Sequence, residues 1–360
     1  MIGGESRSAP LRGAMSVEQI ERELARLRMT EDETLGARAS VLNLIVVTDE
    51  ESAPGVTRVV CELSGRYPSR AMLMISDPEE DKANLEVGLS AFCRTRGSRQ
   101  VCAEQITMHI EGPPAEHLES LAGPLLIPDL PVFLWYPNGG IPPSPECGGM
   151  AALADRLILD SNSGARGDCE AFLRGAADLS ESCALAVGDL QWAALSPWRS
   201  LLADLFAPPE RAGELEKIRH AEVLHGSDGE CEALLFVSWL SAALNWRSEL
   251  VERLEGGRVF YFTGSSGKVA VDLTSNTPEA GLHRVRLFSE EHVFQIEISR
   301  HKEHTDACSV VMRNDELIDE RTVHLGFSSV AMLLGEELEI LGRDEVYEAA
   351  IKRAAEMLDL

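Results

Sequence analysis

A succession of strand, helix and strand in the first quarter of the chain places the strongest constraint on the fold. Residues 39–48, ASVLNLIVVT, are rich in β-branched side chains and predict a buried strand. Residues 55–67 carry apolar side chains on one side of a helix that ends before Pro68, and residues 70–76, RAMLMIS, predict the next strand. Strands joined in this way run parallel through a right-handed crossover. With a third apolar strand at residues 130–136, we expect an α/β domain whose mostly parallel sheet is flanked by helices.

The rest of the first half predicts a hairpin and several helices. Residues 85–94 and 100–111 are extended runs around a short polar turn, which indicates an antiparallel pair. Ser196 and Pro197 are typical of the N-cap and first position of a helix, which we expect to reach residue 206. Further helical patterns cover residues 115–126 and 168–179, and a strand pattern covers residues 153–160.

The second half has a different pattern. A strand at 218–224 and an apolar helix at 232–245 come first. Alternating runs then predict strands at 259–263, 268–273, 282–289, 292–300 and 308–313, and the last two helices are expected at 329–341 and 344–358. This pattern predicts an α+β domain with an antiparallel sheet and packed helices. We therefore divide the chain into a disordered extension (1–15), an N-terminal α/β domain (16–210) and a C-terminal α+β domain (211–360).

The charge balance limits the partners that this chain can bind. It carries 33 basic and 59 acidic residues, a formal net charge of −26. Nucleic acids and anionic membrane surfaces require a basic face, so neither is an expected partner. An acidic surface can instead steer association with a basic protein. The chain shows neither an apolar run of membrane-spanning length nor a secretory signal, which favours the cytoplasm.

Motifs for catalysis or for cofactor binding do not emerge. The loop after the first strand, TDEESAPG, lacks GxGxxG, and its acids at 49–51 would repel a pyrophosphate. The segment GSSGK at 264–268 fails the P-loop pattern and predicts a hairpin turn. A GxSxG nucleophile elbow is absent as well. We therefore predict a protein without catalytic residues or cofactor.

The eight cysteines contain no CxxC pair, so the spacing of a four-cysteine zinc site is absent. In a cytoplasmic chain most of them are expected to be buried, reduced thiols. Cys93 and Cys102 could face each other across the predicted hairpin and form a redox-active disulfide, although core thiols are the favoured interpretation. His301, His304 and Cys308 have a spacing that a loop between strands explains better than a metal site.

Tryptophan and arginine stand out as candidates for a partner interface or a structural centre. Trp135 and Pro137 end the third strand in front of a loop rich in proline and glycine, whereas Trp192 and Trp198 lie on either side of the Ser-Pro helix start. Arg199 follows directly. These residue types are enriched at the energetic centres of interfaces, but they also pack in cores. The candidate set is Trp135, Pro137, Trp192, Pro197, Trp198 and Arg199.

Three stretches resemble the OpcA family. They are the strand at 37–48, the segment LAGPLLIPDLPVFLWYPN at 121–138 with LADRLILDSN at 153–162, and DLQWAALSPWRSLLADLF at 189–206. The resemblance implies an accessory protein without a reaction of its own. Such proteins promote the assembly of glucose-6-phosphate dehydrogenase, the entry enzyme of the oxidative pentose phosphate pathway, or raise its activity. In photosynthetic bacteria the family is linked to redox control by thioredoxin, but no equivalent cysteine motif is identified in this chain.

Two alternatives remain open. The first is a small-molecule-binding α/β protein or enzyme acting on a sugar phosphate or nucleotide, because ligands of such sheets bind beyond the carboxyl ends of the strands. In this chain those ends are Thr48-Asp49, Ser76-Asp77 and Tyr136-Pro137. The second is a thiol-based redox-sensing adaptor that uses Cys93 and Cys102.

Overall fold

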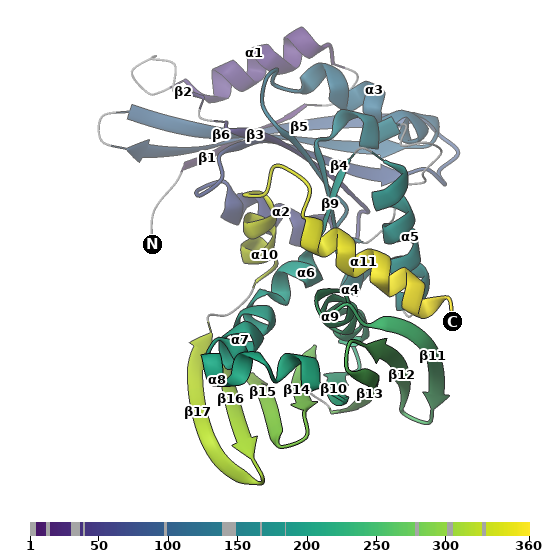
Figure 1. Cartoon of the computed structure of the whole chain (residues 1–360). Coiled ribbons are helices and arrows are strands. Elements are labelled where there is room, and N and C mark those ends of the chain that lie inside the picture. The colour runs from purple at the N-terminus through teal and green to yellow at the C-terminus, as the bar shows by residue number, and fades with distance from the viewer. Residues whose placement is uncertain are drawn as a thin grey trace. The chain divides into compact units, whose positions relative to one another are not determined.

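The computed structural model (Figure 1) describes residues 5–11, 15–29, 37–38, 40–96, 99–138, 149–165, 168–183, 185–277, 281–300, 305–325 and 329–360. The chain forms two compact units. Unit 1 consists of residues 1–160, 182–188 and 330–343, and unit 2 consists of residues 161–181, 189–329 and 344–360. This discontinuous division differs from the single boundary that we predicted near residue 210. The sequence pattern shows where elements change in kind, but not which distant segments return to complete a core.

Unit 1 contains a sheet in the order β1-β5-β6-β4-β3-β7-β8-β9, with β2 added beside β6. The pairs β3–β4, β3–β7, β4–β6 and β7–β8 are parallel, as predicted. The strands are β1 (Glu5–Leu11), β2 (Ala37–Arg38), β3 (Leu42–Thr48), β4 (Ser69–Asp77), β5 (Asn84–Arg96), β6 (Arg99–Glu111), β7 (Val132–Trp135), β8 (Arg156–Leu159) and β9 (Ala186–Asp189).

Helices cover both faces of this sheet, α1 and α3 on one side and α2 and α10 on the other (Figure 1). Helix α1 begins with a capping box, in which Ser16 Oγ accepts from the Gln19 amide and the Gln19 side chain accepts from the Ser16 amide. The helices and 3₁₀ turns are α1 (Val17–Leu27), α2 (Ala53–Leu63), η1 (Pro113–His117), α3 (Leu118–Ala122), η2 (Gly123–Leu125), η3 (Gly149–Leu153) and α10 (Val330–Glu337).

Unit 1 confirms the predicted hairpin and corrects two other expectations. Strands β5 and β6 pair antiparallel, from Asn84 opposite Glu111 to Arg96 opposite Arg99. Part of the predicted disordered extension, residues 5–11, forms β1 and pairs antiparallel with β5. The sheet supplies hydrogen-bond partners that composition alone does not reveal. The single helix expected at 115–126 is instead three short turns, because proline opens η1 and η2.

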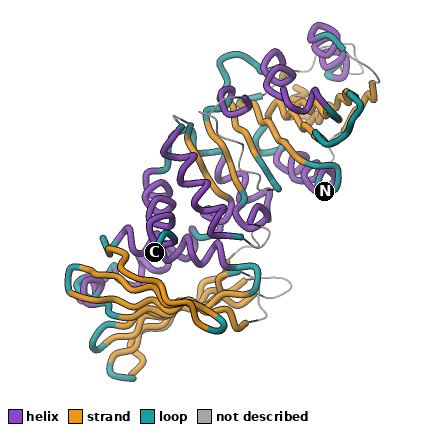
Figure 2. Tube along the Cα trace, turned by 90° about the vertical axis from the view of Figure 1, so that its right-hand side faces the viewer, coloured by secondary structure: helices purple, strands orange, loops and turns teal. Residues whose placement is uncertain are grey.

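Unit 2 contains an eight-stranded sheet in the order β11-β12-β13-β10-β14-β15-β16-β17. All described neighbours are antiparallel except β10 and β13, which run parallel. Figure 2 shows these strands side by side in the lower part of the view. The strands are β10 (His220–Gly226), β11 (Arg247–Leu254), β12 (Gly257–Gly264), β13 (Gly267–Thr277), β14 (Leu282–Phe288), β15 (His292–Arg300), β16 (Thr305–Arg313) and β17 (Glu316–Leu325).

Helices of unit 2 pack on one face of this sheet, with α9 against β10, β13 and β14, and α7 against β15 and β16. The turn at 264–267 joins β12 and β13 as a hairpin, which confirms that prediction. The helices and the 3₁₀ turn of unit 2 are α4 (Ser161–Ala165), α5 (Cys169–Ser182), α6 (Leu190–Ala194), α7 (Ser196–Phe206), α8 (Pro209–Ala212), η4 (Leu215–Lys217), α9 (Glu230–Ala243) and α11 (Glu345–Leu358).

The edge strands β11 and β17 and the short β9 were not predicted as strands. Both edge strands are exposed along most of their length, so their side chains lack the regular alternation of a half-buried strand. The start of α7 is also corrected, because Leu195 occupies the N-cap position and Ser196 already lies within the helix without a side-chain cap. Residues His301 and His304, which were considered with Cys308 as a possible metal site, lie outside the described residues.

Candidate functional site

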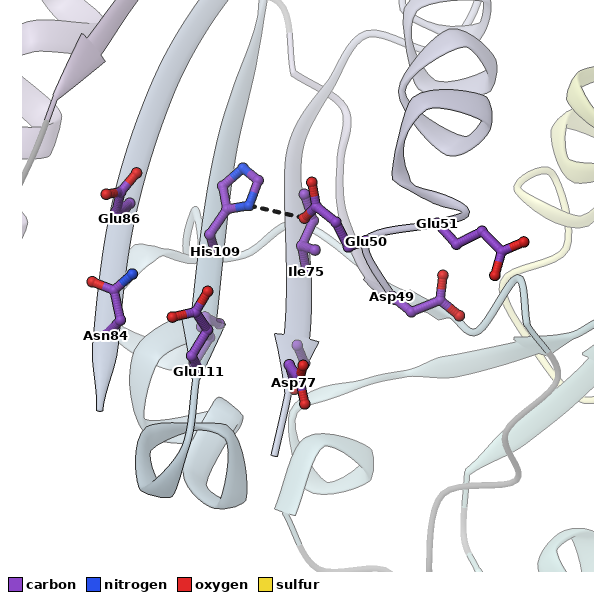
Figure 3. Close-up of a pocket in the computed structure, with 11 residues that line it drawn as sticks. Asp49, Glu50, Glu51, Ile75, Asp77, Asn84, Glu86, His109 and Glu111 are labelled. Carbon is purple, nitrogen blue, oxygen red and sulfur yellow. Dashed lines mark ion pairs between the residues drawn. The ribbon is translucent and has the colours of Figure 1, made fainter. Parts of the chain in front are cut away.

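A hollow of about 630 Å³ lies at the carboxyl edge of the parallel strands of unit 1 (Figure 3). Asp49 follows β3, Asp77 ends β4, and Glu111 ends β6, so the topology brings these carboxylates together. Two of the three strand ends proposed as ligand positions therefore line one hollow. The third, Tyr136-Pro137, is not among the lining residues, which are Asp49, Glu50, Glu51, Ile75, Ser76, Asp77, Asn84, Glu86, His109, Ile110 and Glu111.

The hollow has an acidic wall. Six of its lining residues are carboxylates, and it contains neither lysine nor arginine. His109 is the one lining side chain that can become cationic, and its Nδ1 lies 3.2 Å from Glu50 Oε2. Asp49 also stabilises the start of α2, because its Oδ1 accepts a hydrogen bond from the Ser52 amide at 2.8 Å. A phosphate would meet repulsion here and few donors, so this arrangement does not suit a sugar phosphate or nucleotide.

Sequence reasoning missed the wall contributed by Asn84, Glu86, His109 and Glu111. The register of β5 against β6 sets Glu86 opposite His109 and Asn84 opposite Glu111. Since β6 runs parallel to β4, the same edge also carries Asp77 opposite Glu111. A hairpin prediction with correct register would have revealed this edge. Among the described residues, no group of three or more histidine, cysteine or acidic side chains is arranged to hold a metal ion.

Four of the six nominated interface residues gather within unit 2. The guanidinium of Arg199 lies 3.6 Å above the Trp192 ring and donates to Trp192 O at 2.8 Å and to Ser196 Oγ at 3.1 Å. Trp192 Nε1 donates to Asp344 Oδ2 at 2.8 Å, while Asp344 Oδ1 accepts from the first amides of α11. This cluster joins the α6–α7 corner to the start of α11. Replacing Arg199 would therefore disturb unit 2 itself, so it is not a clean probe of partner binding.

The buried tryptophans lie in cores. Trp198, beside Pro197 in α7, is 1% exposed and packs edge-on against Phe236 of α9, with ring centroids 6.3 Å apart. Trp135, at the end of β7 in unit 1, is also 1% exposed, and Pro137 after it is half-buried. Neither indole face is available to a partner in this structure. A contribution to folding explains the tryptophans better than direct contact does.

Cys93 and Cys102 lie opposite each other on β5 and β6 and form a disulfide with a Cα–Cα distance of 4.0 Å. A second disulfide joins Cys169, at the start of α5, to Cys231 of α9 in unit 2. The expectation of mostly reduced thiols therefore does not hold for these four residues, because strand register and helix packing bring each pair together. Cys61 and Cys308 are free, and burial is the leading cause of the raised pKa of both thiols.

The fold and the hollow together define a mixed α/β and α+β protein whose strand-end hollow is acidic rather than suited to phosphate. Family models described as the N-terminal and C-terminal domains of a glucose-6-phosphate dehydrogenase subunit match residues 60–177 and 185–351. The chain belongs to this family, the OpcA family. In the described residues, no helix is long and apolar enough to cross a membrane.

Curated relatives carry the same family name. A protein of Synechocystis sp. named OxPP cycle protein OpcA is 27% identical over 195 residues, which are 51% of this chain and 38% of that protein. Its namesake in Nostoc punctiforme is 26% identical over 231 residues, 61% of this chain and 48% of that protein. The matches thus span less than half the length of these relatives.

Several solved structures of oxidoreductases show a weak likeness to this chain. KijD10, a 3-ketoreductase from Actinomadura kijaniata solved with NADP and TDP-benzene, has a TM-score of 0.49 and 12% identity, covering 88% of this chain and 96% of the reductase. An NADPH-dependent oxidoreductase from Desulfitobacterium hafniense has a TM-score of 0.47 and 10% identity, covering 88% of this chain and 94% of that protein. With TM-scores below 0.5, these likenesses carry no argument about cofactor or chemistry.

Proposed function

We propose that this chain is a non-catalytic accessory protein that binds glucose-6-phosphate dehydrogenase and promotes its assembly or activity in the oxidative pentose phosphate pathway. The observation that carries the proposal is membership of a family whose models describe dehydrogenase subunit domains over residues 60–177 and 185–351. The acidic wall of the strand-end hollow adds support, because it disfavours the phosphorylated ligands of the alternative hypothesis.

Activation by a protein partner requires differential affinity. The chain would have to bind the active form or oligomer of the dehydrogenase more tightly than a less active one, since only that difference shifts the population. The net charge of −26 would speed association with a basic face of the enzyme and make the rate fall as salt rises. Within this proposal the protein acts in the cytoplasm, where its partner works.

The cognate dehydrogenase, purified separately, provides the test. Adding this chain at micromolar concentration is expected to form a complex in size-exclusion chromatography with light scattering and to raise kcat/KM or shift the enzyme to a larger oligomer. Heat-denatured chain serves as the control. Unchanged kinetics together with the absence of a complex would reject the proposal, as would turnover of glucose 6-phosphate by the isolated chain.

A second candidate function rests on the disulfides. We propose that a dithiol reductant of the thioredoxin type could convert Cys93–Cys102 into two thiols while its own pair becomes a disulfide, so that two electrons and two protons are transferred. The chain would then act as a redox-sensing adaptor. Purified without reductant, it is expected to lack titratable thiols at both positions in mass spectrometry after alkylation, and to gain them with reduced thioredoxin. A count of eight free thiols before reduction would remove this candidate.

A further inference from the structure

The eight-stranded sheet of unit 2 has one face covered by helices and one open face. In the six inner strands, the residues directed at the helices are buried, such as Val271 of β13, Leu287 of β14 and Phe294 of β15. Their chain neighbours point to the opposite face, because side chains alternate along a strand. Within the described part of unit 2, no helix packs on that opposite face.

The strand register aligns one residue from every strand in a single row across the open face. The row consists of Leu250, Tyr261, Ala270, His220, Phe288, Val293, Met312 and Leu317, in the spatial order of the strands. We call it the apolar row. Seven of its members are apolar or aromatic, and His220 stacks on Phe288 with ring centroids 5.0 Å apart. With about 4.8 Å between strands, the row is roughly 30 Å long.

The apolar row is accessible along its whole length. Leu250 and Leu317, at its two ends, are 48% and 58% exposed, and the six residues between them are half-buried. Leaving the apolar row in water does not stabilise the fold, because each Å² of apolar surface that is buried contributes about 25 cal/mol of favourable free energy. Contiguous apolar surface bordered by polar side chains marks a protein-binding site more often than isolated exposed leucines do.

The adjacent row on the same face decides what kind of partner fits. It consists of Glu252, Val259, Asp272, Glu222, Arg286, Gln295, Val310 and Glu320. We call it the acidic row, since it has four carboxylates and one guanidinium. The cationic side chains of these two rows have partners within the rows, because Arg286 pairs with Glu222 at 3.1 Å and His220 Nε2 lies 2.9 Å from Asp272 Oδ2.

We propose that the apolar row and the acidic row together form the surface through which this chain docks a protein that presents an apolar ridge bordered by lysine or arginine. A second copy of this chain fits less well, because it would bring the same excess of carboxylates to the contact. This assignment rests on the proposed function, in which the partner is glucose-6-phosphate dehydrogenase.

Matched substitutions on β17 and β15 test the assignment. Leu317→Asp places a charge on the apolar row. Val323→Asp places a charge on the same strand but on the face that the helices cover, where Val323 pairs with Ala307 of β16. Val323 is 40% exposed, so both variants alter accessible positions. Val293→Asp alters the centre of the row, and Val293→Thr is its conservative counterpart. Melting temperatures identify any variant that fails to fold.

The measurement is affinity for the dehydrogenase by isothermal titration at physiological salt. Val293→Asp is expected to weaken binding at least tenfold and Leu317→Asp severalfold, while Val293→Thr and Val323→Asp leave it unchanged. Glu320→Lys should lower the association rate and its dependence on salt. Undiminished binding by folded Val293→Asp and Leu317→Asp would overturn the surface assignment but leave the proposed function standing.

Two further outcomes are decisive. If the unmodified chain does not bind the dehydrogenase at all, the proposed function and this assignment both fail. If sedimentation shows a homodimer that Val293→Asp dissociates, the occupant of the face is a second copy of the chain, and the basic-partner proposal is overturned.

Discussion

Replacing Arg156 with alanine is expected to destabilise unit 1 by about 3–5 kcal/mol, because it would leave a buried carboxylate without its counter-charge. Arg156 of β8 donates to Glu337 Oε2 of α10 from Nη2 at 2.6 Å and from Nε at 3.2 Å. Both side chains are essentially inaccessible to water. Arg156 Nη1 also donates to Gly342 O at 2.8 Å, so one side chain ties the late segment 330–343 to the sheet.

Chemical denaturation monitored by tryptophan fluorescence and circular dichroism would measure this loss. The matched control is Arg66→Ala, which breaks an exposed ion pair to Glu339 in the same late segment and is expected to cost 1 kcal/mol or less. The double variant Arg156→Met with Glu337→Leu removes both charges and should recover most of the stability. A loss below 1 kcal/mol for Arg156→Ala would show that the pair does not hold the segment in place.

Replacing Glu232 with glutamine is expected to stabilise unit 2 above pH 7 by up to about 3 kcal/mol. Burial at the start of α9 raises the pKa of Glu232 to about 7, against the lowering effect of the Leu282 amide, which donates to Oε2 at 2.8 Å. The unfolded chain ionises this carboxyl near its ordinary value of 4.5. Each tenfold difference in acidity corresponds to about 1.4 kcal/mol, and glutamine can still accept from the Leu282 amide.

The sign of the pH dependence follows from the raised pKa. Below about pH 4.5 the carboxyl is protonated in both states and contributes no difference. As pH rises from about 4.5 to 7, the unfolded chain loses this proton first, so the folded state loses stability relative to it. Denaturation curves for wild type and Glu232→Gln should therefore coincide near pH 4.5 and separate by pH 8. Glu255→Gln, at an exposed position between β11 and β12, is the control. A pH-independent difference between wild type and Glu232→Gln would contradict the argument.

The sequence was sufficient to predict helices and strands whose buried residues recur with the period of a helix or a strand. The run at 42–48 is buried almost throughout and forms β3, and the valines of 55–63 mark the inner side of α2. The hairpin of β5 and β6 also followed from extended runs around a polar turn. Strands β11 and β17 escaped prediction because edge strands exposed on both sides carry no alternation to detect.

The candidate site could be predicted only in part, because about half of its wall depends on the register between strands. Strand ends at Asp49 and Asp77 could be identified from sequence, but His109 and Glu86 reach the same hollow only through the register of β6 with its neighbours. The tryptophan and arginine motifs were predicted as a partner interface or a structural centre, and Trp135 and Trp198 are buried in cores. A motif shows that residues matter, whereas its surroundings determine whether they face a partner or a core.

By itself, the amino-acid sequence determined the two kinds of domain, the acidic character of the chain and its resemblance to the OpcA family, since each depends on composition, period or short motifs. Tertiary structure alone decided that residues 330–343 belong to unit 1, that Cys169 pairs with Cys231, and that one residue from each of eight strands forms the apolar row. These features join residues up to 273 positions apart. Register and packing select such neighbours from many that the local sequence allows equally well.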